Sequence, residues 1–192
     1  MNKKYKFTDN SILKGKRIVM HSWETPIMEK MAEWVCRRGG DILEIGFGMG
    51  IAANFIQQYN INSHTICDNN IEVIERLKNW AIDKKNIKIV EGDWRQNIDN
   101  FGKYDGILFD TFDDMYIDKF KKETVYQLSK FQTNFCIWDN MESKKSIYEN
   151  YETEMIGVNK KDEDSWNYLP GNRVYLHKIT INGDNNYEKN YR

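Results

Sequence analysis

The sequence predicts an α/β fold in which helices cover both faces of a doubly wound, mostly parallel sheet. Strand-like apolar stretches and stretches with helical periodicity follow one another from residue 41 to residue 140. The chain has only two prolines, Pro26 and Pro170, and neither interrupts this alternation. Alternating strands and helices of ordinary length are typical of a parallel sheet with crossover helices. We expect seven strands, the last of which is antiparallel.

The first predicted helix begins near Thr25. Thr25 is the expected N-cap, and Pro26 suits the first helical position because its missing N–H would have no partner there. Met31 and Val35 then recur on one apolar face, and the glycines at 39 and 40 are expected to end the helix.

The strands and helices of the sheet follow in order. Apolar runs between turn residues predict strands, whereas apolar residues at helical spacing predict helices. The predicted strands cover residues 41–48, 64–68, 87–93, 104–112, 134–140, 155–159 and 173–181, and the predicted helices cover residues 51–59, 71–82, 119–131 and 143–152. No helical pattern separates the last two strands, so we expect them to pair antiparallel.

Length and composition limit the possible functions. A chain of 192 residues is long enough for one complete core, so we expect one domain over residues 1–182 with a short N-terminal cap segment, and a flexible tail over 183–192. Lys and Arg number 28 against 29 for Asp and Glu, which disfavours nucleic acid as a partner. The three cysteines are far apart, which favours buried free thiols over a metal site. With no long apolar run, we expect a cytoplasmic protein without membrane partners, as a monomer or homodimer.

The first strand runs into a glycine-rich loop, GFGMG at 46–50. Ligands bind beyond the carboxyl ends of the strands in a doubly wound sheet, so this loop belongs to the expected site. Glycines let the backbone turn sharply and approach a ligand closely. The spacing alone is shared by dinucleotide sites and S-adenosylmethionine sites.

Two acids near this loop help to choose between these cofactors. Glu44 lies inside the strand, where an unpaired charge is costly, and its carboxylate suits the ammonium group of S-adenosylmethionine but would repel a pyrophosphate. Asp68 ends the next strand, a place from which an acid reaches the ribose of either cofactor. The alternatives are a structural buried acid for Glu44, a strand-end cap for Asp68, and, less favoured, a nicotinamide-dependent dehydrogenase.

The third strand ends in Gly92-Asp93-Trp94. Asp93 is expected to accept a hydrogen bond from the adenine amino group, and Trp94 is expected to pack on the ring. Trp94 fits a core position equally well.

The fourth strand leads into a group of acids. Asp110 emerges directly from the buried apolar stretch, whereas Asp113, Asp114 and Asp118 fit a solvated surface. Glu24, just ahead of the first helix, supplies a second carboxylate; the alternative is an acid that only interacts with the helix dipole. Such a pair suits a guanidinium group, whose planar fork of donors a carboxylate binds in bidentate fashion. A guanidinium is also a poor nucleophile, so one carboxylate can hold it while the other accepts its proton.

Several of these stretches together resemble one known family. WETPIM, ILEIGFGMGIAA, HTICDNN, ERLKNW, EGDW and YDGILFDTF are similar to guanidinoacetate N-methyltransferase and its relatives, the arginine N5-methyltransferases, over roughly residues 18–112. The resemblance implies a Rossmann-like, seven-stranded methyltransferase fold. It also implies S-adenosylmethionine as cofactor, S-adenosylhomocysteine as product and a small guanidino compound or an arginyl peptide as substrate.

The resemblance also implies roles for individual residues. The implied cofactor-binding residues are Met20, Met28, Phe47, Gly48, Met49, Gly50, Ile51, Ala52, Asp68, Asn69, Asp93 and Trp94. Glu44 and Gly46 are expected to join them because of their places inside and directly after the first strand. The implied substrate-binding residues are Glu24, Asp110, Thr111, Asp139 and Asn140, of which Asp110 and Glu24 are catalytic and Asp110 is the base.

The sequence also departs from the family pattern. Little chain precedes residue 18, so Tyr5 or Phe7 is expected to take the place of the family's cofactor-covering aromatic residue. No arginine or lysine is evident for clamping a substrate carboxylate. Guanidinoacetate, free arginine and peptide-borne arginine all stay open as acceptors, and a non-catalytic binding module is the alternative from another class.

Overall fold

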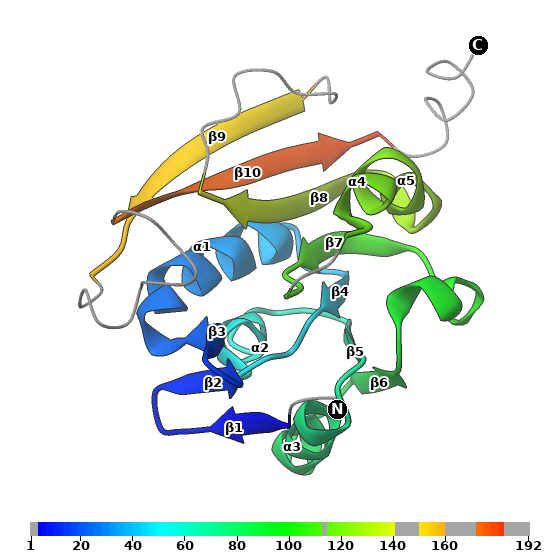
Figure 1. Ribbon diagram of the computed structural model, residues 1–192. Helices are drawn as coiled ribbons and strands as arrows, with labels where there is room; N and C mark the ends of the chain where they lie inside the picture. Colours follow the sequence, from blue (N-terminus) through cyan, green and yellow to red (C-terminus); the bar gives the residue numbers. More distant parts are fainter. Residues whose placement is uncertain (1–3, 113–114, 141–149, 160–171, 183–192) are drawn as a thin grey trace.

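The centre of the protein is a seven-stranded sheet (Figure 1). The computed structural model describes residues 4–112, 115–140, 150–159 and 172–182. The strand order is β6-β5-β4-β7-β8-β10-β9. Strands β4 to β8 pair in parallel, and β10 runs antiparallel to both β8 and β9. The predicted mostly parallel sheet with an antiparallel C-terminal strand is confirmed. The strands are β4 (Asp41–Ile45), β5 (Ser63–Asp68), β6 (Ile87–Glu91), β7 (Tyr104–Phe109), β8 (Ser129–Asp139), β9 (Asn150–Gly157) and β10 (Arg173–Ile181).

Helices cover both faces of this sheet. Helices α1 (Thr25–Cys36), α2 (Ile51–Ile56) and α3 (Ile71–Ala81) pack on one face through the side chains of two core clusters. The other face is covered by α4 (Ile117–Lys119), a π-helical turn (Phe120–Thr124) and α5 (Val125–Gln127), together with 3₁₀ turns at Trp94–Gln96 and Ile98–Asn100. Because apolar side chains point to both faces along β4 and β7, both helical layers pack on buried apolar side chains.

The N-terminal segment forms a second sheet that the sequence did not predict. Strands β1 (Tyr5–Phe7), β2 (Ser11–Lys14) and β3 (Arg17–His21) pair antiparallel in the order β1-β2-β3. The backbone N–H of Tyr5 donates to the Glu72 carboxylate of α3 at 3.0 Å. The guanidinium carbon of Arg76, also on α3, lies 3.9 Å from the Phe7 ring centroid. These contacts fix the small sheet near the carboxyl end of the main sheet (Figure 1).

Three local predictions were wrong. The predicted helix at 143–152 is incorrect where it can be compared, because Asn150 to Glu152 belong to β9; residues 143–149 lie outside the described residues. The helix predicted at 119–131 ends at Gln127, and β8 already begins at Ser129. Helix α1 begins at Thr25 with Glu24 as its N-cap, one residue earlier than expected.

Other expectations are confirmed or concern residues outside the described part of the chain. The last two strands do pair antiparallel. Cys36, Cys67 and Cys136 are buried free thiols, as expected. No helix in the described part of the chain is long and apolar enough to cross a membrane. The predicted tail at 183–192 lies outside the described residues.

Candidate active site

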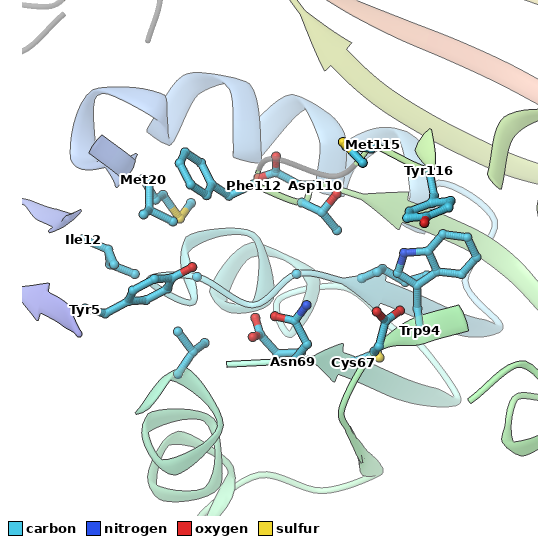
Figure 2. A pocket seen from close by; sticks show the side chains of 18 of the residues that line it. Tyr5, Ile12, Met20, Cys67, Asn69, Trp94, Asp110, Phe112, Met115 and Tyr116 are labelled. Atoms are coloured by element: carbon cyan, nitrogen blue, oxygen red, sulfur yellow. The ribbon is translucent and has the colours of Figure 1, made fainter. Parts of the chain in front are cut away.

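A cavity of about 650 Å³ opens beyond the carboxyl ends of the parallel strands (Figure 2). Figure 2 shows Tyr5 and Met20 of the N-terminal sheet at one end, Trp94 and Tyr116 at the other, and Asp110 between them. Its position is where doubly wound sheets bind ligands. Tyr5, not Phe7, is the N-terminal aromatic residue that lines it.

The glycine loop is in close contact with the loop after β7. Gly46 has a φ of +95°, and a Cβ there would lie 1.8 Å from the carbonyl oxygen of Asp110. Gly48 has a φ of +54°, and its Cβ would lie 2.5 Å from the sulfur of Met20. Position 46 therefore requires glycine for conformation and for space, and position 48 requires it for conformation. The exposed backbone of this loop can approach a ligand without side chains in between.

Asp68 ties the glycine loop to the next turn. Its Oδ2 accepts a hydrogen bond from the backbone N–H of Phe47 at 2.9 Å, and its Oδ1 accepts from the N–H of Asn70, also at 2.9 Å. Burial raises the pKa of the Asp68 carboxyl, and the backbone donors around it act in the opposite direction. The carboxylate lines the cavity, as its predicted ribose-binding role requires.

Asp93 and Trp94 line the same cavity but also have structural partners. Asp93 caps the 3₁₀ turn by accepting from the Arg95 N–H at 2.9 Å and pairs with the Arg95 guanidinium, which lowers the pKa of Asp93. Trp94 is buried, and its ring contacts Phe109 and Phe120 edge-on at centroid distances of 6.0 and 5.1 Å. Trp94 is thus a core residue that also forms part of the cavity wall.

Asp110 is the acid at the centre of the site. It follows β7 and is partly exposed. Its Oδ1 accepts a hydrogen bond from the Trp138 indole N–H at 3.0 Å. Burial raises the pKa of Asp110 to about 6, and the nearby charge of Glu44 acts in the same direction. A carboxyl group with this pKa can exchange a proton near neutral pH.

Glu44 lies behind the cavity wall. Its Oε2 is 2.9 Å from Nε2 of His64 inside the sheet, and its Oε1 is buried without a hydrogen-bond partner. Burial raises the pKa of Glu44, while the contact with His64 acts to lower it. The carboxyl therefore lies below the glycine loop without lining the cavity.

Glu24 is buried in a capping box. It ends the 3₁₀ turn Ser22–Glu24, and its Oε1 accepts from the backbone N–H of His21 at 2.6 Å. The His21 side chain in turn accepts from the N–H of Trp23 at 3.2 Å. Glu24 is not among the described residues that line the cavity.

The structure brings together many, but not all, of the predicted residues. On the cofactor side the cavity is lined by Met20, Gly46, Gly48, Asp68, Asn69 and the pair at 93–94. On the substrate side it is lined by Asp110, Thr111, Asp139 and Asn140. The described lining does not include Met28, Glu44, Phe47, Met49, Gly50, Ile51 or Ala52, and the roles predicted for these residues stay predictions.

Some cavity residues were missed. Arg17 and Arg95 reach the wall, although no arginine was evident from the sequence. Arg95 directly follows EGDW, so its place in the site could have been anticipated, whereas Arg17 belongs to the N-terminal sheet that was not predicted. Trp138 and Tyr116 were also missed, although Trp138 directly precedes the predicted Asp139.

The cavity fits S-adenosylmethionine, which the resemblance implies. Among the described residues, no lysine or arginine lies within ion-pair distance of Glu44, Asp68 or Asp110. A ligand with sulfonium and ammonium groups would reduce the repulsion among these acids, whereas a pyrophosphate would add to it. The cavity volume is also within the ordinary range of ligand sites. Met20, the glycine loop, Asp68 and Asn69 are the residues that would hold the cofactor.

Several known proteins with related sequences carry the same name. Protein arginine N-methyltransferase 2 of Candida glabrata is 37% identical over 131 residues, which are 62% of this chain and 32% of the relative. The Saccharomyces cerevisiae protein of the same name is 30% identical over 167 residues, covering 79% of this chain and 40% of the relative. The chain thus spans well under half the length of these relatives.

The comparison with solved structures supports the fold, and a family model supports the family. Spermidine synthase from Thermotoga maritima superposes with a TM-score of 0.66 at 11% identity, covering 88% of this chain and 64% of that one. At that identity the likeness shows a shared fold alone. The model of the family described as guanidinoacetate N-methyltransferase matches residues 2–135, which is more than half of the sequence. The chain therefore belongs to the guanidinoacetate N-methyltransferase family.

Proposed function

We propose that this chain transfers a methyl group from S-adenosylmethionine to a nitrogen of a guanidino compound. The observation that carries the proposal is the position of Asp110 together with the raised pKa of its carboxyl group. Asp110 lines the cavity, has a pKa of about 6 and has no cationic partner among the described residues. A guanidinium group would supply the missing positive charge and a fork of donors that matches a carboxylate.

Asp110 is the proposed base. The indole N–H of Trp138 fixes the orientation of its carboxylate through Oδ1, so Oδ2 is the oxygen assigned to the reacting N–H. The cofactor, when bound, supplies an electrophilic methyl group. Asp110 accepts the proton as the new nitrogen–carbon bond forms, which keeps a lone pair on the attacking nitrogen. The proton then passes from Asp110 to solvent, and the methylated guanidinium keeps its single positive charge.

Glu24 is the second carboxylate of the proposal. Its Oε1 holds the His21 backbone, and the proposal gives this carboxylate a second contact, with the guanidinium. The support for this role is the sequence resemblance and the position of Glu24 four residues after the cavity-lining Met20. The capping role alone would also explain a buried acid here. The variant Glu24→Gln should separate capping from substrate binding. If Glu24 binds substrate, KM for the acceptor rises much more than the melting temperature falls.

The acceptor is a guanidino compound of either of two kinds. A guanidinoacetate-like small molecule is the first candidate, because of the family to which the chain belongs. Arginine, free or within a peptide, is the second candidate, because the related sequences are named for arginine methylation. A single domain over 1–182, a cytoplasmic location and the absence of nucleic-acid partners stay predictions.

Methyl transfer can be tested with a panel of acceptors. The protein is incubated with S-adenosylmethionine and guanidinoacetate, free arginine or an arginyl peptide, and products are analysed by mass spectrometry. We expect one acceptor to gain a methyl group, and S-adenosylhomocysteine to form in equal amount. Cofactor binding without any methylated guanidine would contradict the proposal and favour a non-catalytic binding module.

A further inference from the structure

The N-terminal sheet places two cations in one row at the rim of the cavity. Lys14 on β2 pairs with Tyr5 on β1 and with Arg17 on β3, so Lys14 is the middle residue of a row that crosses all three strands. Residues directly opposite one another in an antiparallel sheet point to the same face, with Cβ atoms about 5 Å apart. Tyr5 and Arg17 both line the cavity. Because both of its neighbours line the cavity, the Lys14 side chain lies at the cavity rim.

Aromatic rings of the cavity wall hold both cations. The Lys14 Nζ lies 5.9 Å from the centroid of the Tyr5 ring, and the Arg17 guanidinium carbon lies 4.8 Å from the centroid of the Phe112 ring. A cation over the face of an aromatic ring is attracted to it. Phe112 lines the cavity and follows Asp110 by two residues, and Figure 2 shows Tyr5 and Phe112 on the same side of Asp110. The row of cations therefore lies beside the proposed acceptor site.

The ammonium group of Lys14 has no acidic partner in the described part of the chain. None of the described carboxylates lies within ion-pair distance of its Nζ, and its printed contact is the Tyr5 ring. The residue directly opposite on β3 is Arg17, and like charges in that arrangement repel each other. An anion at the rim would reduce this repulsion and would accept hydrogen bonds from the ammonium group. The row therefore favours an anionic group of a ligand.

We propose that Lys14, with Arg17 beside it, forms an anion subsite that binds a carboxylate of the acceptor. The inference rests on the proposed function and adds to it the residue that contacts the end of the acceptor remote from the guanidino group. A free guanidino acid supplies this carboxylate itself, and in a peptide an acidic residue next to the arginine supplies it. Such a residue was not evident from the sequence, because the row exists only in the folded N-terminal sheet.

Matched pairs of acceptors that differ only in one carboxylate test this subsite. The pairs are 4-guanidinobutanoate and its amide, arginine and arginine amide, and two capped dipeptides in which arginine is followed by aspartate or by asparagine. The first two pairs report a free guanidino acid, and the third reports an acidic peptide. In at least one pair we expect the KM of the carboxylate member to be about fivefold lower, in line with a partly exposed ion pair. In Lys14→Gln this difference is lost because the KM of the carboxylate member rises, while kcat changes little.

Lys6 is the matched control on the same small sheet. It follows Tyr5 on β1, so its side chain points to the opposite face, and it is exposed and outside the described cavity lining. Lys6→Gln removes the same charge and should keep the wild-type difference within each pair, and Lys14→Arg should keep it as well. If Lys14→Gln does not fold, the wild-type pairs still decide. No preference for the carboxylate member of any pair, or equal effects of Lys6→Gln and Lys14→Gln, would overturn the subsite.

A binding measurement distinguishes failure of the subsite from failure of methyl transfer. The same pairs are titrated by calorimetry into protein loaded with S-adenosylhomocysteine. Tighter binding of a carboxylate member that is lost in Lys14→Gln supports the subsite even if no acceptor is methylated, in which case only the proposed reaction fails. Equal binding within all pairs overturns the subsite, whatever the turnover. Weaker binding of S-adenosylhomocysteine in Lys14→Gln, with the differences between acceptors unchanged, would overturn it too, because Lys14 would then contact the cofactor.

Discussion

Acidic residues at the two ends of the parallel sheet have opposite electrostatic environments. At the amino end, Asp41 and Asp105 share the ammonium of Lys130, whose Nζ lies 2.6 and 2.8 Å from their carboxylates. Lys130 and the hydroxyl of Ser63 lower the pKa of Asp41. At the carboxyl end, burial raises the pKa of Asp110 to about 6, and no lysine or arginine among the described residues pairs with it.

This difference separates acids that serve the fold from acids near the site of the proposed function. The amino-end carboxylates have their positive partner within the chain, so their charge stabilises the native state. Glu44, Asp68 and Asp110 at the carboxyl end all have a raised pKa, with burial as its first cause. Without a ligand, their charged forms cost stability, and a cationic ligand would reverse that cost.

Removing the charge at the centre of the site should have the largest effect. In Asp110→Asn we expect kcat to fall by about a thousandfold, because the variant cannot accept the guanidinium proton. Cofactor affinity should change little, since the glycine loop and Asp68 are intact. Steady-state kinetics and calorimetry with S-adenosylhomocysteine measure the two quantities. Unchanged kcat would reject Asp110 as the base.

A substitution in the glycine loop should have the next largest effect, on cofactor affinity. Gly46→Ala would place a methyl group 1.8 Å from the Asp110 carbonyl oxygen, at a φ of +95°. We expect cofactor affinity to fall by about thirtyfold or more, because strain of roughly 2 kcal/mol or more must move the loop. Gly102→Ala is the matched control, since nothing lies within 4 Å of a Cβ there. Equal affinity in both variants would show that the loop tolerates a side chain.

The raised pKa of Asp110 predicts an acid limb in the pH profile. As pH falls below about 6, Asp110 becomes protonated and cannot act as a base. kcat/KM, which reports groups of the free enzyme, should fall by about tenfold for each pH unit below that value. If kcat/KM stayed constant down to pH 4.5, this would contradict the assignment of Asp110 as the base.

The raised pKa of Asp110 makes activity and stability change in opposite directions with pH. The native pKa of about 6 lies above the ordinary value of 3.8, so the native state binds more protons than the unfolded state between these values. The contribution of Asp110 to stability therefore falls as pH rises from about 4 to about 6. Asp110→Asn removes that cost, so its melting temperature should exceed that of the wild type at pH 7.5 by more than at pH 4.

The smallest effect is expected at the amino end. Oδ2 of Asp105 accepts from the Asp41 N–H at 2.7 Å and from Lys130 at 2.8 Å. Asp105→Asn should lower the free energy of unfolding by about 1 kcal/mol, because these groups are partly exposed to solvent. Its kcat and KM should stay at wild-type values. Chemical denaturation measures the loss, and a large loss of activity without a change in stability would remove the distinction between the two ends.

The sheet was predictable from the sequence because its central strands are apolar on both faces. Ile42 and Leu108 on one face, and Ile107 and Phe135 on the other, have no exposed surface, so local composition and structure agree. The N-terminal sheet was not predictable, since β1 has only three residues and depends on a contact between Tyr5 and Glu72 that spans 67 positions. The failed helix prediction around Asn150 has a similar cause, because pairing of β9 with β10 overrides the local pattern.

The site was predictable where residues follow strand ends directly. Asp68 and Asp110 could be placed in this way, because the sheet brings strand ends together. The partners of Asp110 and Glu44 could not be placed, since Trp138 is 28 positions from Asp110 and His64 is 20 positions from Glu44. The partner of Glu24 could not be placed either, because its contact with the His21 N–H depends on the 3₁₀ turn at Ser22–Glu24.

The number of protons released on guanidine binding tests most directly whether Asp110 receives the substrate. At pH 6, near its pKa of about 6, roughly half of the Asp110 carboxyl groups carry a proton, and a guanidinium favours the charged form. Calorimetry in two buffers of different ionisation enthalpy, with protein loaded with S-adenosylhomocysteine and the best acceptor, should show release of about half a proton. Asp110→Asn should release none. No release by the wild type, or equal release by the variant, would contradict the assignment of Asp110 to the guanidino group.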